Sequence, residues 1–137
     1  MSSDKLIQVK DVMKKEFDVI DGMNTVEEAL QRMKHYATKT LIIDKRHEHD
    51  EYGIVMLSDI AKNVLARDKA ADRVNVYEIM SKPVITVNAS MDIRYCARLF
   101  DQYGLSRAPV MDNNEIVGII SFTDMVVYGM LDPEQDD

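Results

Sequence analysis

Hydroxyls, a carboxylate and a guanidinium stand near one another in the second half of the sequence, in a combination that can bind a phosphorylated sugar. Ser121, Thr123 and Asp124 are near neighbours, and Arg107 precedes them at the start of an apolar segment. Asp124 can accept hydrogen bonds from both hydroxyls of a sugar diol, because an ionised carboxylate has only acceptors. The two hydroxyls and the guanidinium can bind phosphate oxygens. These residue types therefore predict a site for an anionic, sugar-containing ligand.

An apolar slot beside these polar groups would complete a site for a flat base. Four residues of the second half can form it: Ile85, Thr86, Ala108 and Pro109. An alternative interpretation needs no ligand, since Thr123 and Asp124 together also make a good helix start. Arg107 is then a surface cation.

Other reactive residue types give weaker signals. His47 and His49 could share a divalent metal with the acids beside them, but this segment is strongly acidic and no second ligand cluster is evident. We interpret it as a solvated turn and expect no metal. Cys96 falls on an apolar helix face, which favours a core position. Without a Ser-His-Asp order, a nucleophile elbow or a glycine-rich phosphate loop, we expect no catalytic residue, no catalytic cofactor and no enzyme.

The elements that must position these residues occur twice. Val9–Met13 recurs as Val76–Met80, and the helical apolar face of Val26, Ala29, Leu30 and Met33 recurs as Ile93, Cys96, Ala97 and Phe100, in both cases 67 residues later. Gly53–Asp59 matches Gly118–Asp124 at a spacing of 65 residues. The changed spacing places an insertion within residues 45–52, where we expect an exposed loop.

Each half has the pattern strand, helix, strand, hairpin turn, strand, helix. Thr25 and Asp92 are expected to cap the first helices, and Ser58 and Thr123 the last ones. Asn113-Asn114 is typical of a tight turn between two strands. A half of about 60 residues buries little core alone. The sequence therefore predicts an α+β fold of two β-α-β-β-α repeats packed with pseudo-twofold symmetry.

The first repeat departs from the second at its candidate site. Its corresponding residues are Val19, Lys39, Thr40, Ser58 and Asp59. These retain a cation, hydroxyls and a carboxylate, but Asp18 stands where the second repeat has the apolar Ile85. Burying that charge unpaired would be costly, so we expect the strand to be solvated there or the slot to be altered. If one site binds, we expect it to be the second.

Composition limits the compartment and the partners. The chain has 137 residues, 46% apolar residues and a formal charge of -7, which disfavours binding to nucleic acid and to anionic membranes. No apolar run reaches the length of a membrane helix, so we expect no membrane insertion. Without a secretion signal and with one cysteine, the cytoplasm is the simplest compartment.

The repeat divides the chain into five expected segments. They are an N-terminal tail (1–7), a first repeat (8–66), a linker (67–74), a second repeat (75–131) and an acidic tail (132–137).

In order and spacing, these pieces resemble the tandem cystathionine-beta-synthase (CBS) domain pair, or Bateman module. The resemblance covers residues 8–131. The segments on which it rests are Asp11–Met13, Glu78–Met80, Thr25–Ala29, Gly104–Val110 and Gly118–Asp124.

The resemblance implies a regulatory, non-catalytic module. Such pairs bind adenosine-containing ligands in clefts between the two halves, dimerise, and act on an attached or partner protein. The expected ligands are AMP, ADP, ATP or S-adenosylmethionine, and the effector protein is unknown. The candidate residues of the second half stand at the positions that contact ligand in the family.

A competing hypothesis is a protein-interaction or dimerisation module that binds no small molecule. The irregular first repeat and the acidic surface favour it. Met130 and Leu131 end an apolar last helix with few charges, and an apolar surface of that kind is typical of a partner contact. With the family resemblance, we expect a homodimer.

Overall fold

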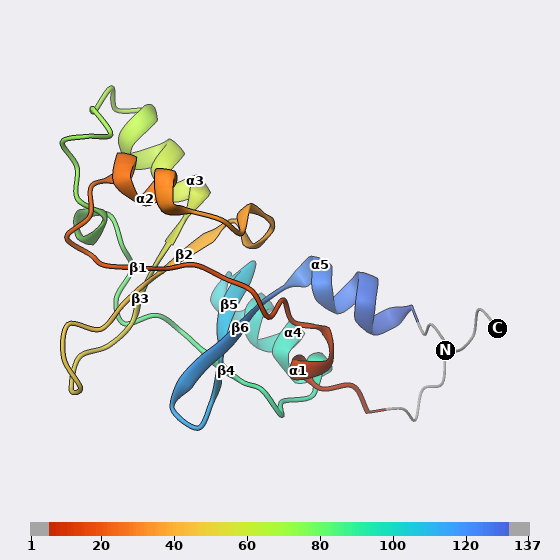
Figure 1. Cartoon of the computed structure of the whole chain (residues 1–137). Coiled ribbons are helices and arrows are strands. Elements are labelled where there is room, and N and C mark those ends of the chain that lie inside the picture. Colours follow the sequence, from red (N-terminus) through yellow and green to blue (C-terminus); the bar gives the residue numbers. More distant parts are fainter. Residues whose placement is uncertain (1–5, 132–137) are drawn as a thin grey trace. The chain divides into compact units, whose positions relative to one another are not determined.

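The computed structural model describes residues 6–131, so the expected acidic tail at 132–137 and most of the expected N-terminal tail lie outside the described residues. Two compact units are present: residues 17–84 form one, and residues 6–16 with 85–131 form the other. Each contains a three-stranded sheet and helices (Figure 1). The predicted α+β class with two repeats is confirmed.

The unit of residues 17–84 is built on the sheet β1-β2-β3. Strand β1 (Val19–Ile20) runs parallel to β2 (Thr40–Ile43), which pairs antiparallel with β3 (Gly53–Met56). Helix α2 (Val26–Arg32) connects the two parallel strands, as a parallel crossover requires. The remaining helices of this unit are η1 (Tyr36–Thr38), α3 (Leu57–Ile60), the π-helix η2 (Ala61–Leu65) and η3 (Val76–Glu78).

Helix α2 begins where the sequence predicts. The Thr25 hydroxyl accepts the Glu28 N–H at 3.1 Å, and the Glu28 carboxylate accepts the Thr25 N–H at 2.8 Å. This reciprocal pair satisfies two N–H groups that the helix itself leaves free. Val26 and Ala29 are fully buried on the face that packs on the sheet, so the predicted cap and apolar face are both confirmed.

The other unit repeats this plan with the sheet β4-β5-β6. Strand β4 (Val87–Asn88) is parallel to β5 (Arg107–Asp112), and β5 is antiparallel to β6 (Glu115–Ser121). Asn113 and Asn114 join β5 to β6 with φ of 51° and 64°. Two consecutive positive φ angles are typical of a type I′ turn, which confirms the predicted tight turn.

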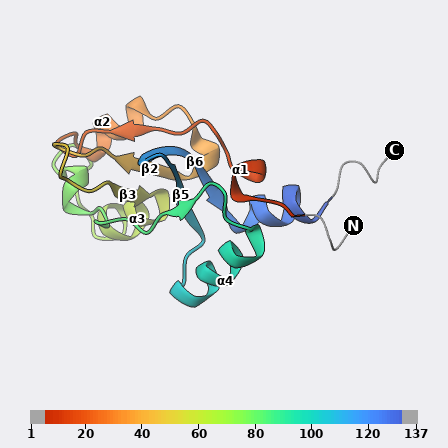
Figure 2. The same cartoon turned by 90° about the horizontal axis from the view of Figure 1, so that it is seen from below.

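Helix α4 (Ile93–Tyr103) covers this second sheet (Figure 2). The Asp92 carboxylate accepts the Arg94 N–H at 2.8 Å, so the predicted cap is confirmed. Cys96 and Phe100 are fully buried in the core, and burial of a side chain as large as Phe contributes about 1.5–3 kcal/mol. The helix ends at Gly104, whose φ of 67° is left-handed, a conformation that glycine adopts without a Cβ penalty.

The predicted caps of the last helices are wrong by two residues. Helix α5 (Phe122–Asp124), which continues into the π-helix η4 (Met125–Met130), is capped by Ser121 and not by Thr123. The cap of α3 is Met56 and not Ser58. The physical reason is that Asp59 and Asp124 occupy the third helical position, from which a carboxylate reaches back to the N–H of the cap residue.

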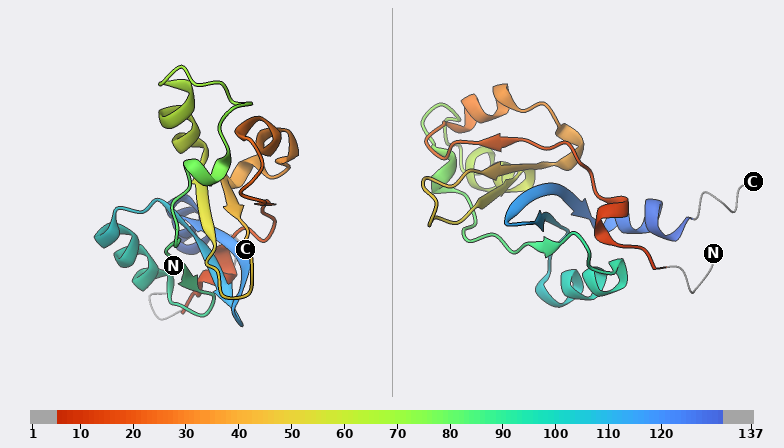
Figure 3. Two further views of the ribbon diagram at one scale, coloured as in Figure 1. Left: turned by 90° about the vertical axis from the view of Figure 1, so that its left-hand side faces the viewer. Right: turned by 60° about the horizontal axis from the view of Figure 1, so that its bottom comes forward.

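The compact units do not follow the order of the repeats along the chain. Helix α1 (Val9–Val12) packs with residues 85–131, where Val9 and Val12 join a core with Phe100. Figure 3 shows α1 beside η4, although the two segments are far apart in sequence. Conversely, η3 belongs to the unit of residues 17–84, and Val76 is in its core. Within residues 6–131, no helix is long and apolar enough to cross a membrane.

Candidate functional site

Strands β5 and β6 bring the polar residues of the second-repeat site together. Arg107 at the start of β5 is the register partner of Ser121 at the end of β6. Thr123 and Asp124 follow immediately in α5. The sheet therefore places the guanidinium-bearing residue, both hydroxyls and the carboxylate at one end of the unit.

The apolar residues of this site come to the same end. Ile85 and Thr86 precede β4, which is parallel to β5 with Val87 opposite Val110. Ile85 is 43% exposed, an arrangement open to a flat ligand, whereas Ala108 is 1% exposed and packs in the core. Ala108 and the buried Pro109 can therefore offer chiefly backbone edges.

Asp124 is a buried carboxylate with every contact supplied from within the unit. Its exposure is 1%. Its Oδ2 accepts the Ser121 N–H at 3.0 Å and the Ser121 hydroxyl at 2.9 Å. Its Oδ1 pairs with Nζ of Lys14, which follows α1. Because the Ser121 hydroxyl also accepts the Asp124 N–H, this hydroxyl is engaged with Asp124, while Thr123 is exposed.

Sequence reasoning missed Lys14. It lies 110 residues from Asp124 in the chain, and its counterpart in the second repeat is Ser81, so neither spacing nor the repeat could reveal it. An opposite charge offsets the cost of burying a carboxylate only when it lies in direct contact. The contact exists because α1 packs into the unit that contains β6 and α5.

The first-repeat residues Lys39, Thr40, Ser58 and Asp59 also meet at one end of a sheet. Thr40 is the register partner of Met56, and the Lys39 carbonyl accepts the Leu57 N–H at 3.0 Å. The Asp59 carboxylate accepts the Met56 N–H at 2.8 Å, and Ser58 is exposed. Val19, in the edge strand β1, is 46% exposed.

Thr40 carries a buried polar atom that lacks a partner. Its side-chain Oγ1 has no hydrogen bond to any described residue, and the residue is 1% exposed. The neighbouring Thr38 hydroxyl bonds to the backbone of Thr40 and not to this oxygen. Leaving a buried hydroxyl unpaired costs about 1–3 kcal/mol. No contact with a described residue offsets this cost at Thr40.

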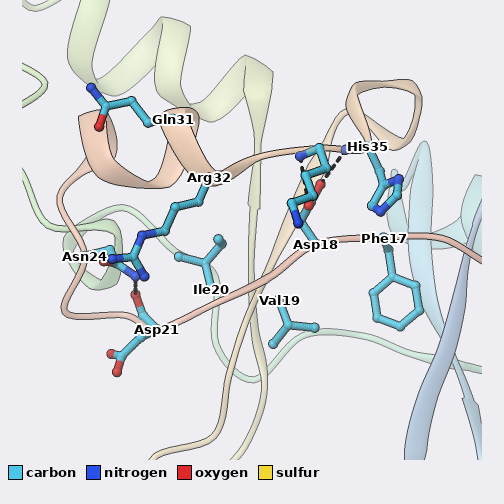
Figure 4. Close-up of a pocket in the computed structure, with 10 residues that line it drawn as sticks. Phe17, Asp18, Val19, Ile20, Asp21, Asn24, Gln31, Arg32 and His35 are labelled. Carbon is cyan, nitrogen blue, oxygen red and sulfur yellow. Dashed lines mark hydrogen bonds between the residues drawn. The ribbon is translucent and has the colours of Figure 1, made fainter.

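A cavity of about 560 Å³ lies between β1 and the end of α2 (Figure 4). Val19 is the only predicted site residue among its described lining. Asp18 lines it too, but its carboxylate accepts the backbone N–H groups of Lys34 at 3.0 Å and His35 at 2.9 Å. Of the two alternatives expected at Asp18, a solvated strand is wrong: the residue is 7% exposed, and two backbone donors supply the hydrogen bonds that burial removes.

The loop of residues 45–52, in which the sequence predicts an insertion, is held by ion pairs. Asp50 pairs with Lys82 Nζ at 2.7 Å and with Arg46 Nε at 3.3 Å, and the Lys82 ammonium in particular holds the pKa of Asp50 below its usual range. Among the described residues, no three His, Cys, Asp or Glu side chains are placed to share a metal ion. Burial raises the pKa of the Cys96 thiol to about 11, so Cys96 stays protonated at neutral pH.

Comparison with known proteins identifies the class. The CBS-domain family model matches residues 9–66 and 76–130. The chain therefore belongs to the CBS domain family and carries two CBS domains in tandem. It is 32% identical over 113 residues to the uncharacterized protein MK0525 of Methanopyrus kandleri, covering 80% of this chain and 57% of that protein.

The solved structures that share the fold and are at least 25% identical to this chain include the following two. The hexameric CBS-CP12 protein from bloom-forming cyanobacteria is 38% identical with a TM-score of 0.84, covering 89% of this chain and 67% of that one. The CBS domain pair of protein MJ0100, solved with 5′-methylthioadenosine and S-adenosyl-L-methionine, is 28% identical with a TM-score of 0.75. That match covers 92% of this chain and 98% of the MJ0100 pair.

Proposed function

We propose that this protein is a regulatory CBS pair that binds an adenosine-containing ligand at the second-repeat site and thereby changes the activity of a partner protein. The observation that carries the proposal is the buried carboxylate of Asp124 beside the register pair of Arg107 and Ser121. A buried carboxylate at the open end of a sheet suits the two hydroxyls of a ribose. The module regulates and does not catalyse.

Each part of the ligand has a counterpart. Ile85 and Thr86 face the base, with backbone edges from Ala108 and Pro109. Asp124 accepts the ribose hydroxyls, and Ser121 orients its carboxylate. Thr123 and Arg107 contact the substituent at the 5′ position. The MJ0100 pair, crystallised with two adenosine compounds, supports AMP, ADP, ATP or S-adenosylmethionine as the ligand class.

The first repeat provides a second, weaker site. The unpaired hydroxyl of the buried Thr40 supports it, because a ligand donor would satisfy that oxygen. Val19, Lys39, Ser58 and Asp59 complete this site. Asp18 is already bound by backbone N–H groups and contributes no charge to it.

A thermal-shift screen against adenine and guanine nucleotides, S-adenosylmethionine and 5′-methylthioadenosine tests the proposal. A ligand at 100 times its Kd should add about 2.7 kcal/mol to the free energy of unfolding. Asp124→Asn keeps the shape of the side chain but removes its charge, so we expect an affinity at least about tenfold lower by calorimetry. Asp112→Asn, an exposed carboxylate at the far end of β5, is the matched control.

Unchanged affinity in Asp124→Asn would contradict the proposal that Asp124 binds the ribose hydroxyls. If folded protein shows no shift with any of these compounds, the competing hypothesis of a ligand-independent interaction module takes precedence.

An exposed apolar face favours that hypothesis. It consists of Val126, Val127, Tyr128, Met130 and Leu131, each 42–68% exposed.

A further inference from the structure

We propose that Lys14 determines the ligand class of the second-repeat site by selecting adenosine compounds with a negatively charged 5′ substituent. This inference rests on the proposed function, since it assumes that the ribose binds Asp124. Lys14 is a specificity-determining residue: in the free protein its ammonium occupies the carboxylate oxygen that the ribose needs.

The two oxygens of Asp124 have different partners. Oδ2 is held by the backbone N–H and the hydroxyl of Ser121, at 3.0 and 2.9 Å. Oδ1 is bound by Lys14 Nζ alone among the described residues. Loss of the Ser121 contacts would uncap α5, whereas the Lys14 contact can be exchanged without unfolding a helix. A ribose diol therefore reaches the carboxylate through Oδ1.

Lys14 has a fixed backbone and a side chain that reaches solvent. Its N–H donates to the Ile119 carbonyl and its carbonyl accepts the Ile119 N–H, both at 2.9 Å. A Cβ on Gly118 would lie 2.6 Å from the Lys14 carbonyl oxygen, so glycine permits this close approach. The side chain is 31% exposed and has a flexible four-carbon stem. The ammonium can therefore leave Oδ1 while its backbone remains in place.

The first repeat lacks this cation. Asp59 corresponds to Asp124 and likewise accepts the N–H of its cap residue, at 2.8 Å. The position that corresponds to Lys14 is Ser81, and among residues 6–131 no cation pairs with Asp59. The ion pair is thus a property of one site and not of the repeated fold.

Ligand charge decides the outcome of the exchange. When ribose hydroxyls take Oδ1, Lys14 loses a contact with a buried carboxylate, and neutral hydroxyls replace only part of that interaction. A phosphate on the same ligand gives the released ammonium a new anionic partner. An uncharged 5′ group offers none, and a sulfonium adds a further positive charge beside Lys14 and Arg107. The site therefore favours nucleotides over 5′-thioadenosine compounds.

Titration calorimetry with AMP and 5′-methylthioadenosine tests the inference, because both contain adenosine and differ in the charge at the 5′ position. We expect the wild-type protein to bind AMP at least about tenfold more tightly. Lys14→Gln should reduce this ratio to about threefold or less, because AMP loses the ammonium that binds its phosphate and 5′-methylthioadenosine no longer has to displace that ammonium from Asp124. Lys15→Gln, the adjacent exposed lysine, is the matched control and should keep the wild-type ratio.

A second variant covers the case in which Lys14→Gln does not fold because Asp124 loses its counter-ion. Lys14→Arg retains the positive charge, so it should fold and retain the preference for AMP. In the wild type, rising NaCl concentration should lower the AMP to 5′-methylthioadenosine ratio, since salt screens a partly exposed charge pair.

The outcomes separate the two proposals. Equal affinities for both compounds in the wild type, or an unchanged ratio in folded Lys14→Gln, overturn the role of Lys14 and leave the adenosine site standing. A ratio that does not respond to salt also counts against it. Binding of neither compound to folded wild-type protein overturns the inference, and it overturns the proposed function as well if no other compound of the thermal-shift screen binds.

Discussion

Asp124 and Asp18 are two buried carboxylates that the protein stabilises in different ways. Asp18 receives two backbone N–H groups from the segment after α2, and these donors cannot leave without disturbing the chain. Asp124 is held by Ser121 at Oδ2, whereas its Oδ1 is bound by Lys14, on a flexible side chain. Since burying a charge is tolerated only with full hydrogen bonding, Asp18 is a structural tie between β1 and α2. Asp124 is the carboxylate that can exchange its partner.

Replacement of Thr40 by valine should stabilise the ligand-free protein. The substitution keeps the shape of the side chain and removes a hydroxyl that has no partner among the described residues. We expect a gain of about 1–2 kcal/mol, equivalent to a rise in Tm of roughly 3–7 °C by calorimetry. Thr40→Ser, which keeps the hydroxyl and removes the methyl group, should lower Tm. A lower Tm in Thr40→Val would mean that the hydroxyl is satisfied in solution.

Local signals predicted residues whose partners are close in sequence. Thr25 and Asp92 bond to N–H groups two or three positions ahead. Cys96 lies on the apolar face of α4, which the helical spacing of the apolar residues predicts. Lys14 and the backbone donors to Asp18 depend on how distant segments pack, which spacing does not encode. The thirteen candidate ligand residues stay a prediction, because only a bound ligand tests them.

At the level of elements, the hairpin of β2 and β3 is tied to the segment before β4 by the pair of Asp50 and Lys82. The ammonium lowers the pKa of Asp50 in the folded protein, so the carboxylate stabilises the hairpin above the unfolded value near 3.8. This stabilisation is lost as the pH falls through the folded value. Asp50→Asn should therefore accelerate amide exchange of the hairpin at pH 7, measured by hydrogen–deuterium exchange.

The difference between Asp50→Asn and wild type should shrink as the pH falls below about 4, because Asp50 is then protonated in the unfolded state and its ionisation in the folded state contributes progressively less to stability. Glu51→Gln, an exposed neighbour in the same loop, is the control and should exchange like the wild type. A difference that persists unchanged into acid would show that Asp50 acts through the shape of its side chain and not through its charge.

The order of elements followed from the repeat, but two helix starts did not. Ser58 and Thr123 are good cap residues by type, yet β3 and β6 end earlier and their acids occupy the third helical position. Residue type alone does not distinguish a cap from the first turn, since hydroxyl residues suit both. The expected exposed insertion lies between β2 and β3, where residues 46–49 are exposed.

For the whole molecule, the exposed apolar face defined above (Val126–Tyr128, Met130 and Leu131) leads us to predict self-association. The wild-type protein should have a mass of at least a dimer by light scattering coupled to size exclusion. The double substitution Val127→Glu and Met130→Glu should shift it to monomer, because burying a charge unpaired opposes association.

Leu65→Glu, an equally exposed apolar position on η2, is the control and should leave the mass unchanged. A monomeric wild type at concentrations of about 100 μM would contradict the prediction. A homodimer in particular stays a prediction until the mass is measured.

The membership of α1 and η3 in the two units has a consequence for synthesis on the ribosome. Residues 17–84 include every segment of their unit, so all the residues of this unit are available once residue 84 has left the exit tunnel. Residues 6–16 emerge before residues 17–84, but their unit also needs residues 85–131. Val9 and Val12, fully or nearly buried in the folded protein, therefore cannot enter their core until residues 85–131 have been translated. A segment made before residues 17–84 completes its unit only after them.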